Sequence, residues 1–171
     1  MSLLNAKRIA DLTEQVEAES KKMAAKHQMF RARISEDVVG GFTDYLQSNG
    51  FEVAKTNTGS KAAYKGLTVE LVLPEANEAY IGMYHSFKIL VDGKEKFVRV
   101  NAKFKGDSSE RPALNADKIQ SLEFQLVQLE KGLNDLELES YKFDCAQPIR
   151  NQRVKPVLKE NISEVLDCLL A

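Results

Sequence analysis

The stretch Ala79–Lys105 reads AYIGMYHSFKILV-DG-KEKFVRVNAKFK and decides the predicted fold of the chain. Two segments that alternate apolar and polar residues flank the dipeptide Asp92-Gly93. This dipeptide is typical of a two-residue type I′ turn, which needs positive φ at both positions. Aspartate tolerates such a φ and glycine adopts it freely. The sequence therefore predicts an antiparallel β-hairpin centred on this turn.

The turn also determines which residues of the hairpin lie opposite one another. The apolar pairs, in order from the turn, are Phe87 with Val98, His85 with Val100, Met83 with Ala102, and Ile81 with Phe104. A shift of one residue would divide these side chains between the two faces, so turn and pattern support the same register. We expect this face, including His85, to lie in the core.

The other face of the hairpin carries aromatic rings and cations, with Glu95 as its one acid. The candidate binding residues on it are Tyr80, Tyr84, Lys88, Phe97, Arg99, Asn101, Lys103 and Lys105. Rings stack on bases and cations meet phosphates, so the face is a candidate platform for single-stranded nucleic acid. A solvated outer face, or one partly covered by a helix, explains the same residues. Glu52 and Glu70 on the neighbouring strands weaken the nucleic-acid interpretation.

The composition is that of an ordinary globular protein. The 171 residues are 43% hydrophobic and 29% charged, which allows a sizeable core and argues against disorder. A net charge of −1 gives no global attraction to nucleic acid, so such binding depends on local clusters. The N-terminal residues contain no secretory apolar run, and no stretch approaches the roughly 18 apolar residues of a membrane span. We expect a cytoplasmic protein with no membrane association.

Residues 1–50 are predicted to form two helices. Leu3–Arg33 contains no proline or glycine, and its apolar residues recur in the three- and four-residue steps of a coiled-coil-like helix. Ser35 is the expected N-cap of a second helix that ends at Asn49-Gly50. The first helix has acids in its first half and cations in its second. If it ends near Arg33, this order complements the helix dipole, and phosphate binding is the alternative explanation.

The next two regions complete the predicted fold. Residues 51–105 contain strands at Phe51–Asn57 and Leu67–Leu73 before the hairpin, and residues 106–116 form a polar loop. Residues 117–171 contain a long helix over Asp117–Glu139, a short strand at Tyr141–Cys145 and a final helix from Pro156. We predict one α+β domain over residues 1–171. In it, an antiparallel meander of about four strands is flanked by two long amphipathic helices and a C-terminal helix. The long helices are expected to pair antiparallel within the chain or to meet across a dimer.

No residue pattern predicts catalysis, a metal site or a cofactor. The two histidines, His27 and His85, fall in different elements, and Cys145 and Cys168 are too far apart for a CxxC pair. The chain also lacks GxSxG, GxGxxG and HExxH motifs. A nucleophilic pair of Cys145 with His85 stays an alternative, because such groups meet only in space.

Two functional hypotheses follow from these patterns. The leading one is a non-catalytic protein–protein interaction module that docks onto another protein, or a second copy of itself, through its long helices and exposed sheet face. The heptad-like apolar seams and the absence of catalytic motifs motivate it. The alternative is binding of single-stranded nucleic acid or another polyanion through the basic and aromatic face of the hairpin.

Overall fold

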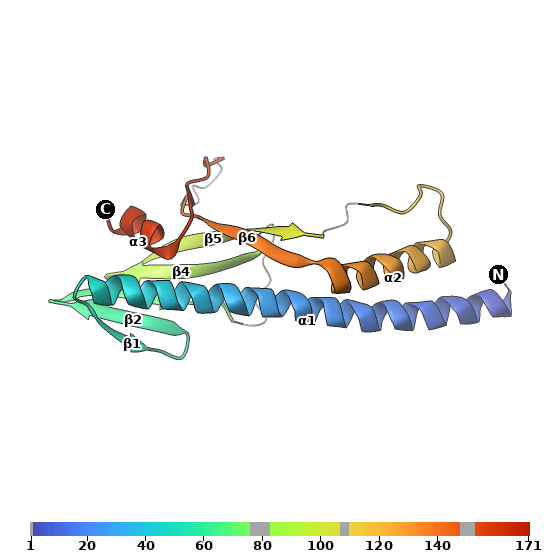
Figure 1. Cartoon of the computed structure of the whole chain (residues 1–171), viewed down its shortest axis with the longest axis horizontal. Coiled ribbons are helices and arrows are strands. Elements are labelled where there is room, and N and C mark those ends of the chain that lie inside the picture. The colour runs from blue at the N-terminus through green and yellow to red at the C-terminus, as the bar shows by residue number, and fades with distance from the viewer. Residues whose placement is uncertain (1, 76–82, 107–109, 148–152) are drawn as a thin grey trace. The chain divides into compact units, whose positions relative to one another are not determined.

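The computed structural model describes residues 2–75, 83–106, 110–147 and 153–171. Within them the chain is an α+β protein with three helices and a seven-stranded antiparallel sheet whose strands follow chain order (Figure 1). The α+β class and the antiparallel meander are therefore confirmed. The contacts group the chain into a helical unit, Met1–Phe30 with Phe104–Glu139, and a sheet unit, Arg31–Lys103 with Ser140–Ala171. That the chain is one domain stays a prediction.

The N-terminal region is one helix, α1 (Leu3–Ser48), and the predicted break before a second helix is wrong. The expected cap Ser35 lies inside the helix. It is tolerated there because its hydroxyl has a tertiary partner, the Nε2 atom of His85 at 2.8 Å. From Ile34, the residue before Ser35, the helix buries an apolar stripe made of Ile34, Val38, Phe42 and Leu46. Packing of this stripe outweighs the local capping signal.

The predicted end of the second helix is confirmed as the end of α1. Gly50 has a φ of 84°, and the Phe51 N–H donates to the Leu46 carbonyl at 3.0 Å. This is the arrangement in which glycine closes a helix through the left-handed region. Earlier in α1, Gly41 lies directly against the Ile162 side chain, so the absence of a Cβ allows this close approach.

The sheet has seven strands within the residues that the structure describes, so the prediction of about four is too low. They are β1 (Glu52–Lys55), β2 (Gly59–Tyr64), β3 (Leu67–Val72), β4 (His85–Val91), β5 (Lys94–Lys105), β6 (Glu137–Asp144) and β7 (Leu158–Lys159). β2 was not predicted, because this strand consists largely of small residues with low β-propensity. A second turn with positive φ at both residues, Lys65-Gly66, joins β2 to β3.

The central hairpin forms as predicted. Asp92 and Gly93 have φ values of 48° and 78°, and β4 pairs with β5 in the expected register from Val91–Lys94 to His85–Val100. The apolar face is buried, with His85, Phe87, Ile89, Val98 and Val100 each at most 4% exposed. The predicted pair of Ile81 with Phe104 lies outside the described residues.

The second long helix is shorter than predicted. α2 (Lys118–Asp135) begins with a capping box between Asp117 and Gln120 and ends before Leu136. The residues that follow belong to β6, because they take up the ladder beside β5 and this pairing overrides their helical propensity. The predicted final helix is likewise preceded by the short strand β7, and α3 (Ile162–Leu170) starts at its N-cap Asn161. Only α1 is therefore a long helix.

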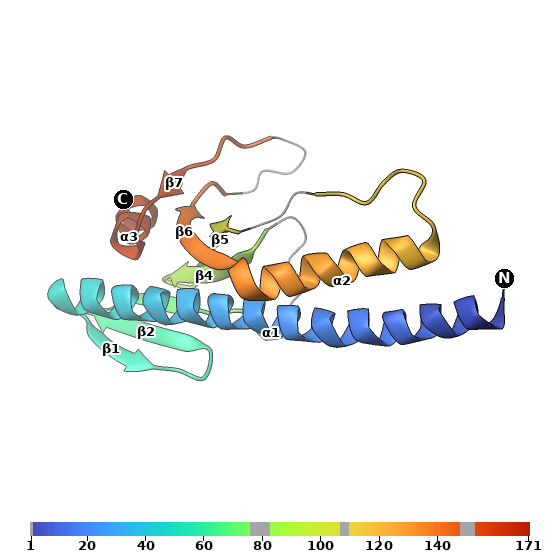
Figure 2. The same cartoon turned by 45° about the vertical axis from the view of Figure 1, so that its right-hand side comes forward.

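The helical unit pairs the first part of α1 with α2, side by side (Figure 2). Arg8 forms an ion pair with Glu123, and further along both helices Lys26 donates to the carbonyls of Gly132 and Leu133 at 3.2 and 2.7 Å. From the first contact to the second, the residue numbers increase in α1 and also in α2, so the two helices are parallel. The expected antiparallel hairpin is wrong because that arrangement belongs to helices joined by a short loop, whereas five strands separate these two.

Candidate functional site

The predicted binding residues are divided between the two units. The structure describes every predicted binding residue except Tyr80, which lies outside the described residues. Tyr84, Lys88, Phe97, Arg99, Asn101 and Lys103 belong to the sheet unit, whereas Lys105 belongs to the helical unit. Asn101, Lys103 and Lys105 are exposed, and the others are partly buried.

Arg99 is held by the protein itself. Its guanidinium lies 2.9 Å from the carboxylate of Asp144 and donates to the Ala146 carbonyl at 2.7 Å. Asp144 is 6% exposed, and its other oxygen accepts from the N–H groups of Ala146 and Val157. Arg99 therefore links β5 to the end of β6 and to the segment before β7. Moving it to a phosphate would leave the buried carboxylate without its cation, which is costly.

Phe97 is also tied to the segment after β6. The Gln147 side chain accepts from the Phe97 N–H and donates to the Phe97 carbonyl, both at 3.0 Å. A side-chain amide thus pairs with the backbone of β5 in the way that a strand would. The Phe97 ring is only partly exposed, so it offers less stacking surface than the sequence suggested.

Tyr84 and Lys88, which also belong to this face, have intramolecular neighbours as well. The Arg31 guanidinium lies 4.9 Å from the centre of the Tyr84 ring and donates to the Tyr84 carbonyl at 3.0 Å. Burial raises the pKa of the Tyr84 phenol. Lys88 lies 3.2 Å from Glu95, although both side chains are well exposed, so this ion pair is weak.

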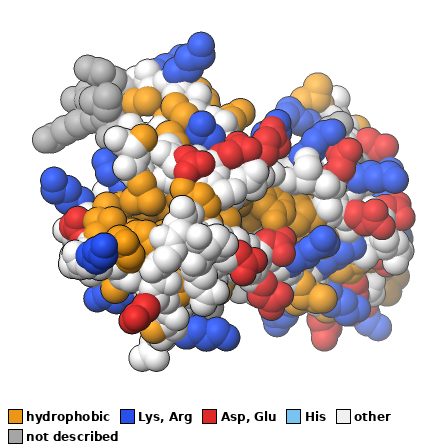
Figure 3. Space-filling view, turned by 60° about the vertical axis from the view of Figure 1, so that its left-hand side comes forward, with side chains coloured by type: hydrophobic (Ala, Val, Ile, Leu, Met, Phe, Trp, Pro, Cys, Tyr) orange, Lys and Arg blue, Asp and Glu red, His pale blue; other side chains and the backbone are white. Residues whose placement is uncertain are grey.

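The protein surface shows no single basic platform on the face seen in Figure 3. There, Lys and Arg side chains are interspersed with Asp and Glu, and apolar side chains are exposed between them. A mixed surface of this kind gives little local attraction for a polyanion.

The sequence did not reveal that Ser35 and His85 lie within hydrogen-bonding distance of each other. Ser35 Oγ lies 2.8 Å from Nε2 of His85, which is 4% exposed. Burial, and then the positive charge of Arg31, lower the pKa of His85 to about 4, so the ring is neutral near pH 7 and is a weak base. The pair joins α1 to β4. The sequence signal that could have indicated this contact is Ser35, a polar residue beside the apolar stripe of α1.

The Cys145 thiol, considered above as a nucleophile, lies in a buried environment. Cys145 is buried and has Cys168 of α3 as a neighbour. Burial, and then the neighbouring Cys168, raise the pKa of the Cys145 thiol to about 12, so it is not poised as a thiolate. No group of three metal-ligating side chains occurs in residues 2–75, 83–106, 110–147 and 153–171. In these same ranges, no helix combines the length and apolarity needed to cross a bilayer.

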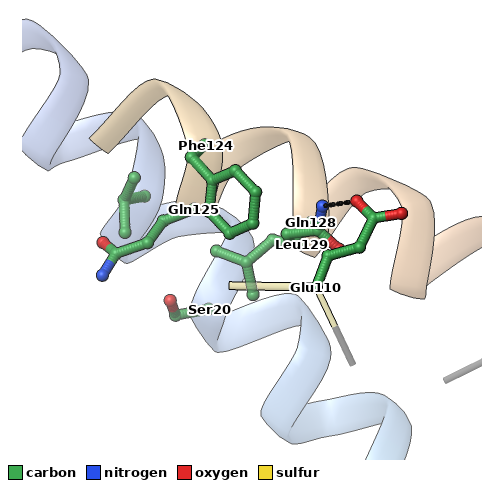
Figure 4. Close-up of a pocket in the computed structure, with 7 residues that line it drawn as sticks. Ser20, Glu110, Phe124, Gln125, Gln128 and Leu129 are labelled. Atoms are coloured by element: carbon green, nitrogen blue, oxygen red, sulfur yellow. Dashed lines mark hydrogen bonds between the residues drawn. The ribbon is translucent and has the colours of Figure 1, made fainter. Parts of the chain in front are cut away.

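The helical unit has a different kind of surface. Of its described apolar residues, only Leu122 and Leu136 are buried. The other apolar residues along the contact between α1 and α2 are partly exposed. The side chain of Val127 is 57% exposed. One turn before it on α2, Phe124 lines an open hollow of about 430 Å³ that is bordered by α1, α2 and Glu110 (Figure 4). The hollow is lined by Val16, Ser20, Glu110, Phe124, Gln125, Gln128 and Leu129. We call these residues, together with Val127, the helical surface.

These observations define an α+β protein with a well-packed sheet unit and a partly exposed pair of parallel helices. Comparison with protein families, with curated proteins and with solved structures finds no match to this chain.

Proposed function

We propose that this chain is a non-catalytic protein–protein interaction module that docks through its coiled-coil-like helical unit. The observation that carries the proposal is the partly exposed seam between α1 and α2, with the hollow beside it. Two helices alone cannot cover an apolar stripe wider than their own contact line. Contiguous exposed apolar surface of this kind marks interaction sites in stable proteins.

The composition of the helical surface also suits a protein partner. Phe124, Leu129 and Val16 supply apolar area, and the exposed amide of Gln125 supplies hydrogen bonds at its border. An apolar centre with a polar border is the usual anatomy of a protein interface. The exposed outer face of the β4–β5 hairpin is a secondary docking surface in this proposal.

Binding of single-stranded nucleic acid is the second proposal. The exposed Asn101 and Lys103 at the outer end of β5 favour it. We rank it lower because Arg99 and Tyr84, two of its central residues, already have intramolecular partners. It predicts binding to oligonucleotides that weakens steeply with salt and weakens further in Arg99→Ala.

A photo-crosslinking experiment tests the leading proposal. A photoreactive phenylalanine analogue is placed at Val127, and at the exposed Lys61 of β2 as the matched control. We expect position 127 to cross-link to a protein in living cells, whereas position 61 does not. Absence of adducts at position 127, or equal labelling at both positions, would contradict docking through the helical surface.

A further inference from the structure

The charges along α1 change sign in the middle of the helix. The acidic segment contains Asp11, Glu14, Glu17 and Glu19, and the basic segment contains Lys21, Lys22, Lys26, Arg31 and Arg33. No acid interrupts the basic segment, and no cation interrupts the acidic one. Such an ordered change of sign needs a physical explanation.

The helix dipole does not supply it. The dipole acts on charges within the first and last turns of a helix. α1 continues to Ser48, so the basic segment ends about four turns before the end of the helix. The last turn of α1 contains no basic residue and its first turn no acidic one. The explanation that fits a helix ending near Arg33 therefore fails for the helix that forms.

Contacts within the helical unit do not account for the charges either. Lys26 binds the end of α2, and Lys22 pairs with Glu19 one turn away at 2.5 Å. Asp11, Glu14, Glu17 and Lys21 are exposed, and none of them forms an ion pair with any described residue. These charges are available to a partner.

The available charges border the helical surface. Ser20 lines the hollow, and Glu17 lies one turn before it on the same side of α1. Glu14, Glu17 and Lys21 are spaced by three and four residues, so they share one face of the helix. A helix that covers the hollow would therefore run alongside these charges.

An antiparallel copy of α1 has the matching charge order. When two copies of the helix are aligned in opposite directions about residue 20, residues 11–19 of each, which carry the four acids, face residues 21–29 of the other, which carry Lys21, Lys22 and Lys26. At the two ends of this overlap, Arg31 and Arg33 lie opposite the like-charged Arg8 and Lys7. A parallel alignment would instead place like charges together. Two-fold dimers have this self-complementary form, in which each copy offers the same surface to the other. The α1 part of the helical unit is about 40 Å long, enough for an interface of standard size.

We propose that the partner of the helical surface is a second copy of this chain, bound with the two α1 helices antiparallel and their acidic and basic segments in contact. This inference rests on the proposed docking function and names its partner. In the dimer, the second helix pair covers the hollow beside Val16 and Phe124, while the charges select the antiparallel orientation.

Charge reversal on the full-length chain tests the inference. One variant carries Glu14→Lys and Glu17→Lys, and the other carries Lys21→Glu and Lys22→Glu. We expect the wild type to sediment at twice the 19.2 kDa of one chain at micromolar concentration. Each variant alone should self-associate about tenfold more weakly or worse, because like charges then meet. An equal mixture of the two variants should recover the dimer, because their segments are again complementary.

The controls separate this inference from the proposed function. Circular dichroism is expected to show unchanged helix content in both variants, since all four positions are exposed. A monomeric wild type, or dimers that persist in both variants alone, would overturn the inference. If the wild type is monomeric while position 127 still cross-links to another protein in cells, docking stands and the second copy is excluded. If both experiments fail, both proposals are lost.

Discussion

The two units of this protein differ in how completely they bury their apolar residues. In the sheet unit, residues from α1, the strands and α3 are sealed from solvent, with twelve large side chains less than 2% exposed. The helical unit buries only Leu122 and Leu136 among its described apolar residues. The first is a folded core in itself. The second is a surface whose apolar stripe a partner can complete.

The largest expected effect compares one phenylalanine from each unit. Phe42 is 0% exposed, whereas Phe124 is partly exposed on α2. Phe42→Ala should lower the free energy of unfolding by about 3–5 kcal/mol, because it leaves a cavity in a packed core. Phe124→Ala should cost less than half of this. Chemical denaturation of both variants measures the difference, and equal losses would remove the contrast between the units.

The next effect concerns pH and the sheet unit. The pKa of His85 is lowered from 6.5 to about 4, so the unfolded chain binds a proton at a higher pH than the folded one. The stability from the neutral ring is present above pH 6.5 and is lost as the pH falls towards 4. The loss should approach about 3 kcal/mol.

Hydrogen exchange at several pH values measures this loss. Amides of the sheet unit should lose protection in that window, and His85→Gln should flatten the loss. If His85→Gln loses protection with falling pH in the same way as the wild type, His85 is not the group responsible for the loss.

Ion pairs provide a smaller comparison. Arg99 and its buried partner Asp144 are 26% and 8% exposed, whereas Arg8 and Glu123 in the helical unit are 61% and 42% exposed. Arg99→Gln should destabilise by about 2 kcal/mol, because it leaves a buried carboxylate without its cation. Arg8→Gln should cost less than about 1 kcal/mol. Thermal unfolding in matched buffers distinguishes them, and similar costs would mean that the Arg99 link is not structural.

The smallest expected effect has opposite signs in the two units. A Cβ at Gly41 would meet the Cγ2 methyl of Ile162, which the branched Cβ of that residue holds in the core, whereas a Cβ at Gly132 would meet the flexible terminal methyl of Met23 at 2.6 Å. Gly41→Ala should destabilise by about 1–2 kcal/mol through overpacking. Gly132→Ala should stabilise by up to about 1 kcal/mol, because Met23 can move and alanine favours a helix. Denaturation curves of the two variants give both signs, and destabilisation by Gly132→Ala would show that the helical unit is packed as tightly as the sheet unit.

The central hairpin could be predicted because its signals are local. The Asp92-Gly93 turn and the alternation beside it occupy adjacent residues and support the same register. The continuity of α1 through Ser35 could not be predicted in this way, because the partner of that serine, His85, lies in a distant strand. The boundary between α2 and β6 was missed for the same reason, since pairing with β5 overrides the local helical pattern.

The candidate site was predictable only in part. The composition of the hairpin face is visible in the sequence, but the partners that occupy Arg99 and Phe97 come from the segment after β6. Such contacts depend on the fold and leave no local pattern. The apolar seams of α1 and α2, in contrast, were visible as heptad-like spacing, and their incomplete burial emerged only from the structure.

Lys26 has a consequence for how α1 and α2 can move against each other. Its ammonium group donates hydrogen bonds to the carbonyls at the end of α2. Without these bonds, two parallel helices that meet only through apolar side chains would be free to slide along each other. Sliding by one heptad, about 10 Å, would restore the apolar contacts but break these hydrogen bonds. A polar residue that interrupts the seam therefore selects one axial position, and the helical surface keeps a constant shape.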